Sequence, residues 1–187
     1  MNAYIVVEGP TDEVILRALL PDEVLDSLVI VPVGSRSSPV SIARTLLVTK
    51  HKPVVLLTDS DTRNETRLQE QRQTTEELLK AVSGKIPVKV ILCVPEIETV
   101  FFHAPQVIER VFGGGMPKEL FLLARDRPKE ILSELFAREA PGPRDLRSLL
   151  DVLDHEDIEA LRSAPPIREL IKFLTETATR PPQTTPR

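Results

Sequence analysis

Six carboxylates follow short apolar runs of the sequence, and residues of this type can hold a divalent cation. They are Glu8, Asp12, Asp59, Asp61, Glu96 and Glu98. Carboxylate oxygens without histidine or cysteine favour a hard ion, Mg²⁺ or Mn²⁺. A bound cation also removes the repulsion between neighbouring carboxylates, which would otherwise raise their pKa values. The residue types therefore favour chemistry assisted by Mg²⁺ or Mn²⁺, provided that the fold brings the acids together.

The spacing of two pairs of acids supports this hypothesis. Asp59 and Asp61 are two residues apart, so in an extended segment both side chains point to one side and can share an ion. Asp12 falls in the first turn of a predicted helix after Glu8, and Gly9 permits the tight turn between them. Acids at helix starts are also common as caps. Neither pair alone indicates a site, but their joint placement after successive apolar runs does.

The elements that must position these acids are predicted in the first hundred residues. Short runs rich in β-branched residues predict strands over 3–7, 28–33, 53–58 and 88–94. Helical patterns separate them over 11–20, 40–50 and 64–82. Strands that are apolar on both faces are typical of a parallel sheet covered by helices on both sides. Short buried helical turns would give similar runs, but the regular spacing and β-branched content favour strands.

A parallel sheet would bring the acids to one edge. Ligands of such sheets bind beyond the carboxyl ends of the strands. Three of the four predicted strands are followed by acids, and the second is followed by a loop over 34–39 that contains Arg36. We therefore expect at least five carboxylates to converge there.

The pattern changes after about residue 105. Short helices are expected over 106–112, 117–124, 129–138, 145–153 and 167–177. This predicts an α/β domain over 1–104 and a small C-terminal helical extension over 105–178, anchored by Phe101 and Phe102. Residues 179–187 lack apolar side chains and are predicted to be a disordered tail.

Composition excludes several classes of protein. The 187 residues are 41% hydrophobic and carry 24 Lys and Arg against 28 Asp and Glu, a formal net charge of −4. One cysteine and three histidines argue against a disulfide framework, a zinc finger and a histidine-built metal site. Because no apolar run reaches about 18 residues and no signal-peptide pattern is present, we expect a cytoplasmic protein without a membrane partner. The negative charge argues against coating nucleic acid by charge alone, but not against an enzyme whose acids hold cations.

The segments Glu8-Gly-Pro-Thr-Asp12 after a first strand and Asp59-Ser-Asp61 after a third resemble the motifs of the TOPRIM domain. This metal-binding catalytic module occurs in topoisomerases, bacterial primases, OLD-family nucleases and small nucleases that mature ribosomal RNA. The resemblance covers residues 3–103, and the first motif is most similar to the OLD-like branch. It implies a Rossmann-like α/β fold with a four-stranded, mainly parallel sheet flanked by helices.

The resemblance also implies a role for each acid of the two motifs. Glu8 corresponds to a glutamate that ligates metal or acts as a general acid or base. Asp59 and Asp61 correspond to a pair of metal ligands. These three residues are therefore the expected catalytic set.

Further residues are implied by the OLD-like branch. Asp12 matches an additional acidic ligand in the helix after the first strand. Another acid follows the fourth strand, and either Glu96 or Glu98 can take that place. Glu98 is preferred because Glu96 comes directly after a proline where the strand ends. The branch also uses a downstream lysine, for which Lys118 and Lys129 are both candidates.

Two arginines are candidates for binding substrate. Arg36 lies in the loop after the second strand and Arg63 follows the Asp59–Asp61 pair, so each can reach a phosphate at the sheet edge. An exposed loop arginine is an equal alternative for Arg36. Arg67 and Arg72, on the polar helix over 64–82, are expected to belong to a solvated face.

Together these features favour a metal-dependent endonuclease that hydrolyses the phosphodiester bonds of nucleic acid, preferably DNA. Two ions are expected, one held by Glu8, Asp12 and Glu98 and the other by Asp59 and Asp61. The resemblance implies a role in defence against phage or mobile elements, with a separate ATPase as partner. It is also compatible with an oligomeric protein. Two alternatives are a ribonuclease that processes a structured RNA precursor and a non-catalytic TOPRIM module that binds nucleic acid or a partner.

Overall fold

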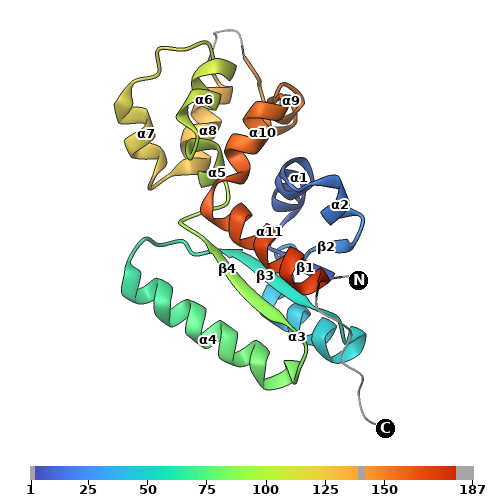
Figure 1. The fold of residues 1–187 in the computed structure, drawn as a ribbon. Coiled ribbons are helices and arrows are strands. Elements are labelled where there is room, and N and C mark those ends of the chain that lie inside the picture. Colours follow the sequence, from blue (N-terminus) through green and yellow to red (C-terminus); the bar gives the residue numbers. More distant parts are fainter. Residues whose placement is uncertain (1–2, 139–141, 180–187) are drawn as a thin grey trace.

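A computed structural model describes residues 3–138 and 142–179, and it confirms the predicted α/β fold. The sheet is four-stranded and Rossmann-like, with the order β2-β1-β3-β4 and every neighbouring pair parallel. The strands are β1 (Ala3–Val7), β2 (Leu28–Pro32), β3 (Val54–Asp59) and β4 (Val88–Cys93), as Figure 1 shows. Each lies within one residue of its predicted bounds. The sheet is thus parallel throughout rather than only mainly so.

Side chains of β1, β3 and β4 alternate between two hydrophobic cores. In β1, Ile5 packs into the core on one face and Val6 into the core on the other. In β3, Leu57 and Leu56 divide in the same way. All four side chains are at most 1% exposed. This two-sided burial is why the strands read as continuous apolar runs instead of alternating apolar and polar residues.

Helices cover both faces of the sheet (Figure 1). On one side lie α3 (Pro39–Lys50) and α4 (Glu65–Ser83), which share a core with the sheet. On the other lie α1 (Pro10–Leu19) and the C-terminal helix α11 (Pro165–Ala178). The apolar residues of α11 recur at helical spacing as Ile167, Leu170 and Leu174, all of them buried.

The remaining helices are short, and all of them except α2 lie between β4 and α11 in the chain. Their bounds are α2 Asp22–Leu25, α5 Thr99–Phe102, α6 Pro105–Val111, α7 Lys118–Ala124, α8 Pro128–Phe136, α9 Leu146–Asp151 and α10 His155–Arg162. Phe101 is fully buried and joins this helical region to the sheet's core. No helix in the described ranges is both long and apolar enough to cross a membrane.

The hydrophobic core continues across residue 104, the predicted end of the α/β domain. One set of contacting buried side chains runs from Ile5 in β1 through Val107 and Leu132 to Leu170 in α11. The division into two domains stays a prediction, but both parts contribute to one core. The predicted tail lies outside the described residues except for Thr179.

Sequence patterns predict no helix over 155–162, where the structure has α10. Its start is defined by a capping box. Asp154 accepts a hydrogen bond from the backbone N–H of Asp157 at 2.9 Å, and the Asp157 carboxylate accepts one from the Asp154 N–H at 3.0 Å. The helix buries little apolar surface, so the sequence marks its start by the capping box and not by the spacing of apolar residues.

We expect Asp154→Ala to lower the free energy of unfolding by about 1 kcal/mol, because the first turn of α10 loses its cap. Urea unfolding followed by circular dichroism measures this change. Asp151→Ala is a suitable control, since Asp151 is exposed at the end of α9 and caps no helix start. Equal losses in the two variants would contradict the capping role.

Candidate functional site

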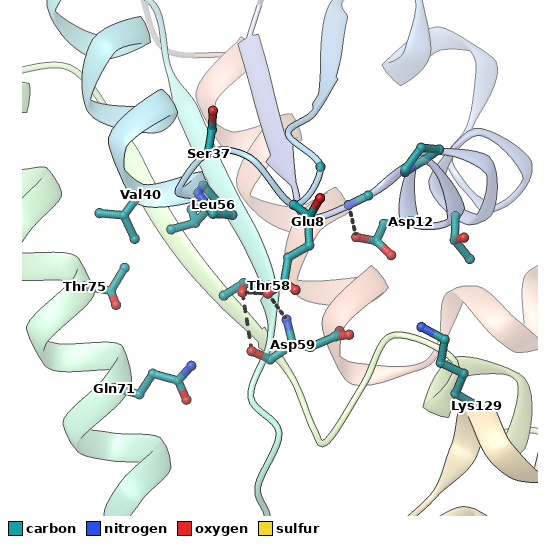
Figure 2. Close-up of a pocket in the computed structure, with 16 residues that line it drawn as sticks. Glu8, Asp12, Ser37, Val40, Leu56, Thr58, Asp59, Gln71, Thr75 and Lys129 are labelled. Atoms are coloured by element: carbon teal, nitrogen blue, oxygen red, sulfur yellow. Dashed lines mark hydrogen bonds between the residues drawn. The ribbon is translucent and has the colours of Figure 1, made fainter.

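The carboxyl ends of β1 and β3 open into a hollow of about 610 Å³, which we call the strand-end pocket. Its walls come from the start of α1, the loop between β2 and α3, one face of α4 and the start of α8 (Figure 2). The polar side chains that line it are Glu8, Thr11, Asp12, Ser35, Ser37, Thr58, Asp59, Gln71, Thr75 and Lys129. The predicted edge of the sheet is therefore a concave site.

Glu8 and Asp59 are joined across the ends of β1 and β3. The Glu8 Oε1 atom accepts hydrogen bonds from the Thr58 hydroxyl and, at 3.1 Å, from the Asp59 backbone N–H. The Asp59 Oδ1 atom in turn accepts one from the Ile97 N–H at 2.9 Å. These bonds hold both carboxylates in place. Thr58 was not among the predicted residues, although a polar residue ending an apolar strand is a usable signal.

Asp12 points back from the first turn of α1 and caps that helix. Its Oδ2 atom accepts a hydrogen bond from the Gly9 N–H at 3.0 Å, and the residue is only 8% exposed. Burial raises the pKa of Asp12, and the nearby Glu8 carboxylate raises it further. Asp12 therefore combines a capping role with a place in the strand-end pocket.

Glu98, at the start of α5, is the more buried of the two candidates after β4. It is 4% exposed, and its Oε2 atom is buried with no hydrogen-bond partner among the described residues. Burial is the main cause that raises its pKa, and the charges of Glu96 and Asp12 add to it. Glu96 instead accepts a hydrogen bond from the Lys129 backbone N–H at 3.3 Å. The structure thus brings Glu98 toward the other acids and turns Glu96 toward α8.

Asp59 lies at the electrostatic centre of the site. Burial, followed by the charges of Asp12, Glu8 and Glu98, raises its pKa to about 8. These four carboxylates come from three strand ends and influence one another, and we call them the acid cluster. The cluster contains four of the six predicted metal-ligand candidates.

Asp61 does not join the acid cluster, contrary to the expectation that it shares a side with Asp59. The strand ends at Asp59, and the next residues turn toward β4, where the N–H groups of Ser60 and Asp61 donate to the Pro95 carbonyl at 2.9 and 3.1 Å. Asp61 adopts a left-handed backbone with φ of 52°. Because the segment is not extended, the two-residue alternation no longer applies. Asp61 and Glu96 line a neighbouring hollow of about 370 Å³ instead.

The two predicted substrate-binding arginines lie outside the strand-end pocket. Arg36 is exposed and does not line it, although its neighbours Ser35 and Ser37 do. Arg63 forms an ion pair with Asp126 at 2.7 Å, which ties the loop after β3 to the segment before α8. As placed, neither arginine faces the acid cluster.

Of the two candidate lysines, the structure brings only Lys129 to the pocket. Its side chain points from α8 toward the acids (Figure 2), and its positive charge opposes the rise in the pKa of Asp12 and Glu98. Lys118 is exposed at the start of α7 and does not line the pocket. Among the described residues that line the strand-end pocket, Lys129 is the one cation beside the carboxylates of Glu8, Asp12 and Asp59.

The donor set fits a divalent cation of the hard type. All four members offer carboxylate oxygens, and the buried Oε2 atom of Glu98 lacks a donor within the described residues. Burial and the neighbouring carboxylates raise the pKa of Asp59 to about 8, so added positive charge would favour its ionised form. Within the same ranges, no three acidic, histidine or cysteine side chains are already arranged as a metal-binding group.

Fold and site define a Rossmann-like α/β protein with a carboxylate cluster at the carboxyl edge of its sheet. Comparison with known proteins adds no family: no family model matches the chain, and no curated protein matches it in sequence. The likeness to TOPRIM domains therefore stays a prediction that rests on the two motifs.

Proposed function

We propose that the protein is a divalent-metal-dependent nuclease of the TOPRIM type that hydrolyses phosphodiester bonds, with DNA as the favoured substrate. The observation that carries this proposal is the acid cluster: four carboxylates meet at one edge, and the pKa of Asp59 is raised to about 8. Neighbouring carboxylates repel one another when they are ionised, so the acid cluster destabilises the fold unless positive charge neutralises it. It becomes useful when it binds a cation next to a phosphate.

In this proposal Glu8, Asp12, Asp59 and Glu98 hold Mg²⁺ or Mn²⁺, drawn together from their present positions. The bound cation supplies positive charge for the phosphate and makes a water molecule more acidic. The bonds from Thr58 and the Asp59 N–H keep Glu8 oriented at the site. The Lys129 ammonium offers a second positive charge to the phosphate. A second ion, if it uses Asp61 and Glu96, would belong to the neighbouring hollow.

Cleavage assays on purified protein test the proposal. Supercoiled plasmid, single-stranded DNA and structured RNA are each incubated with Mg²⁺, Mn²⁺ or a chelator. We expect DNA cleavage with either metal and none with the chelator. Cleavage of RNA alone would favour the ribonuclease alternative. Metal binding by calorimetry without any cleavage would favour a non-catalytic module. A separate ATPase partner and a defence role remain proposals carried by the resemblance.

A further inference from the structure

One face of α4 lines two adjoining hollows at the carboxyl edge of the sheet. The strand-end pocket and a second hollow of about 550 Å³ share Gln71 and Thr75, and the second hollow continues along the helix to Arg67. Residues four apart lie on the same face of a helix, so Arg67, Gln71 and Thr75 form one stripe. At 1.5 Å per residue the stripe is about 12 Å long.

The half of the strand-end pocket next to α4 is uncharged. Gln71 and Thr75 face Val40, Leu56 and Ser37 across it, while the acids lie toward α1 and α8 (Figure 2). Within the described ranges, neither the Gln71 amide nor the Thr75 hydroxyl hydrogen-bonds to another residue. By contrast, Gln73 on the solvent side of α4 donates to Glu77 at 2.9 Å. The stripe therefore presents neutral donors and acceptors directly beside the acid cluster.

The size and charge of these hollows favour a single strand over a duplex. A volume of about 610 Å³ lies in the range of pockets that hold one small ligand, so it can admit a nucleotide but not a double helix. Among the described residues, Arg67 is the one cation that lines the second hollow, against Asp61 and Glu70. Duplex binding draws on many phosphate contacts, which this lining does not offer. Neutral amide and hydroxyl groups instead suit the edges of unpaired bases.

We propose that Arg67, Gln71 and Thr75 form a track for a single nucleic-acid strand that leads to the acid cluster. Gln71 and Thr75 contact the nucleoside next to the phosphate that is cleaved, and Arg67 contacts a phosphate farther along the strand. This inference rests on the proposed nuclease function and names its substrate class, nucleic acid with an unpaired strand.

Fluorescence anisotropy on the whole chain tests the track. The probes are labelled DNA and RNA strands of about 12 nucleotides, long enough to exceed the stripe at about 3.4 Å per stacked base, and their duplexes. Ca²⁺ replaces Mg²⁺ so that binding is measured without cleavage. We expect single strands to bind about tenfold or more tightly than duplexes, and the triple variant Arg67→Gln, Gln71→Ala, Thr75→Ala to lose about tenfold in affinity.

A double variant, Gln69→Ala with Gln73→Ala, is the matched control because both residues are exposed on the same helix outside the stripe. Its affinity should stay within about twofold of wild type. Circular dichroism checks that both variants fold. Binding of either the DNA or the RNA strand supports the track, since its contacts are to bases and phosphates.

Three results would overturn the track: no binding of single strands, duplex binding as tight as single-strand binding, or an unchanged affinity in the triple variant. A cleavage assay distinguishes a failure of the track proposal from a failure of the nuclease proposal. If wild type cleaves no substrate but the triple variant still loses binding, the track stands and the nuclease proposal fails. If the triple variant cleaves single strands at the wild-type rate, the track fails and the nuclease proposal stands.

Discussion

Asp59→Asn is expected to lower the rate of metal-dependent cleavage by about 10³-fold or more, because it removes the carboxylate at the centre of the acid cluster. The change is nearly isosteric. The amide oxygen can still accept the hydrogen bond that Ile97 donates at 2.9 Å, so the end of β3 should keep its structure. Initial rates of cleavage of labelled single-stranded DNA in Mn²⁺ measure the effect, and circular dichroism verifies the fold.

Asp26→Asn provides the control for this experiment. Asp26 is exposed after α2, away from the strand-end pocket, and undergoes the same chemical change. It should cleave at the wild-type rate. A rate for Asp59→Asn within about tenfold of wild type would show that Asp59 does not assist catalysis, since metal-site carboxylates contribute more than that.

The wild-type protein without divalent metal is expected to lose stability as the pH rises from about 4 to about 8. Burial and neighbouring carboxylates raise the pKa of Asp59 from 3.8 to about 8 in the folded state. Between these values the folded protein keeps a proton that the unfolded chain has released, so the free energy of unfolding falls with increasing pH. The raised pKa values of Asp12 and Glu98 act in the same direction.

The expected loss is about 2 kcal/mol once partial exposure to solvent is allowed for, or about 4–8 °C in Tm. Thermal unfolding in a chelator across this pH range measures it. Millimolar Mg²⁺ should restore much of the loss at pH 8, because the ion binds the ionised cluster of the folded state alone. Asp59→Asn should flatten both the pH dependence and the Mg²⁺ response. A wild-type stability that rises between pH 5 and pH 8 in chelator would contradict the prediction.

Much of the fold was predictable because the strands of a parallel sheet buried on both faces appear in the sequence as continuous apolar runs. Val54–Asp59 and Val88–Cys93 are apolar almost throughout, and such runs identify strands directly. Once the strands are parallel, their carboxyl ends must share an edge. The meeting of Glu8, Asp59 and Glu98 there follows from topology without any knowledge of side-chain detail.

Two of the features that sequence patterns missed depend on contacts between distant segments. The direction of Asp61 is set by backbone hydrogen bonds to Pro95, which belongs to the segment after another strand. The choice of Lys129 over Lys118 depends on how α8 packs beyond the sheet. Helix α10 is different, because the only sign of it in the sequence is the local capping box of Asp154 and Asp157. None of these features has a periodicity that a single segment could display.

The position of α11 has a consequence for how the protein folds during synthesis. This helix packs against β4, where Glu169 pairs with Lys89 at 2.6 Å, although it comes much later in the chain. All four strands therefore leave the ribosome before the helix that covers part of one of their faces. Until α11 follows, that apolar face stays open to water and to chaperones, as expected for contacts of large sequence separation. We expect nascent chains that stop before Pro165 to be protease-sensitive, and those that include α11 to be resistant.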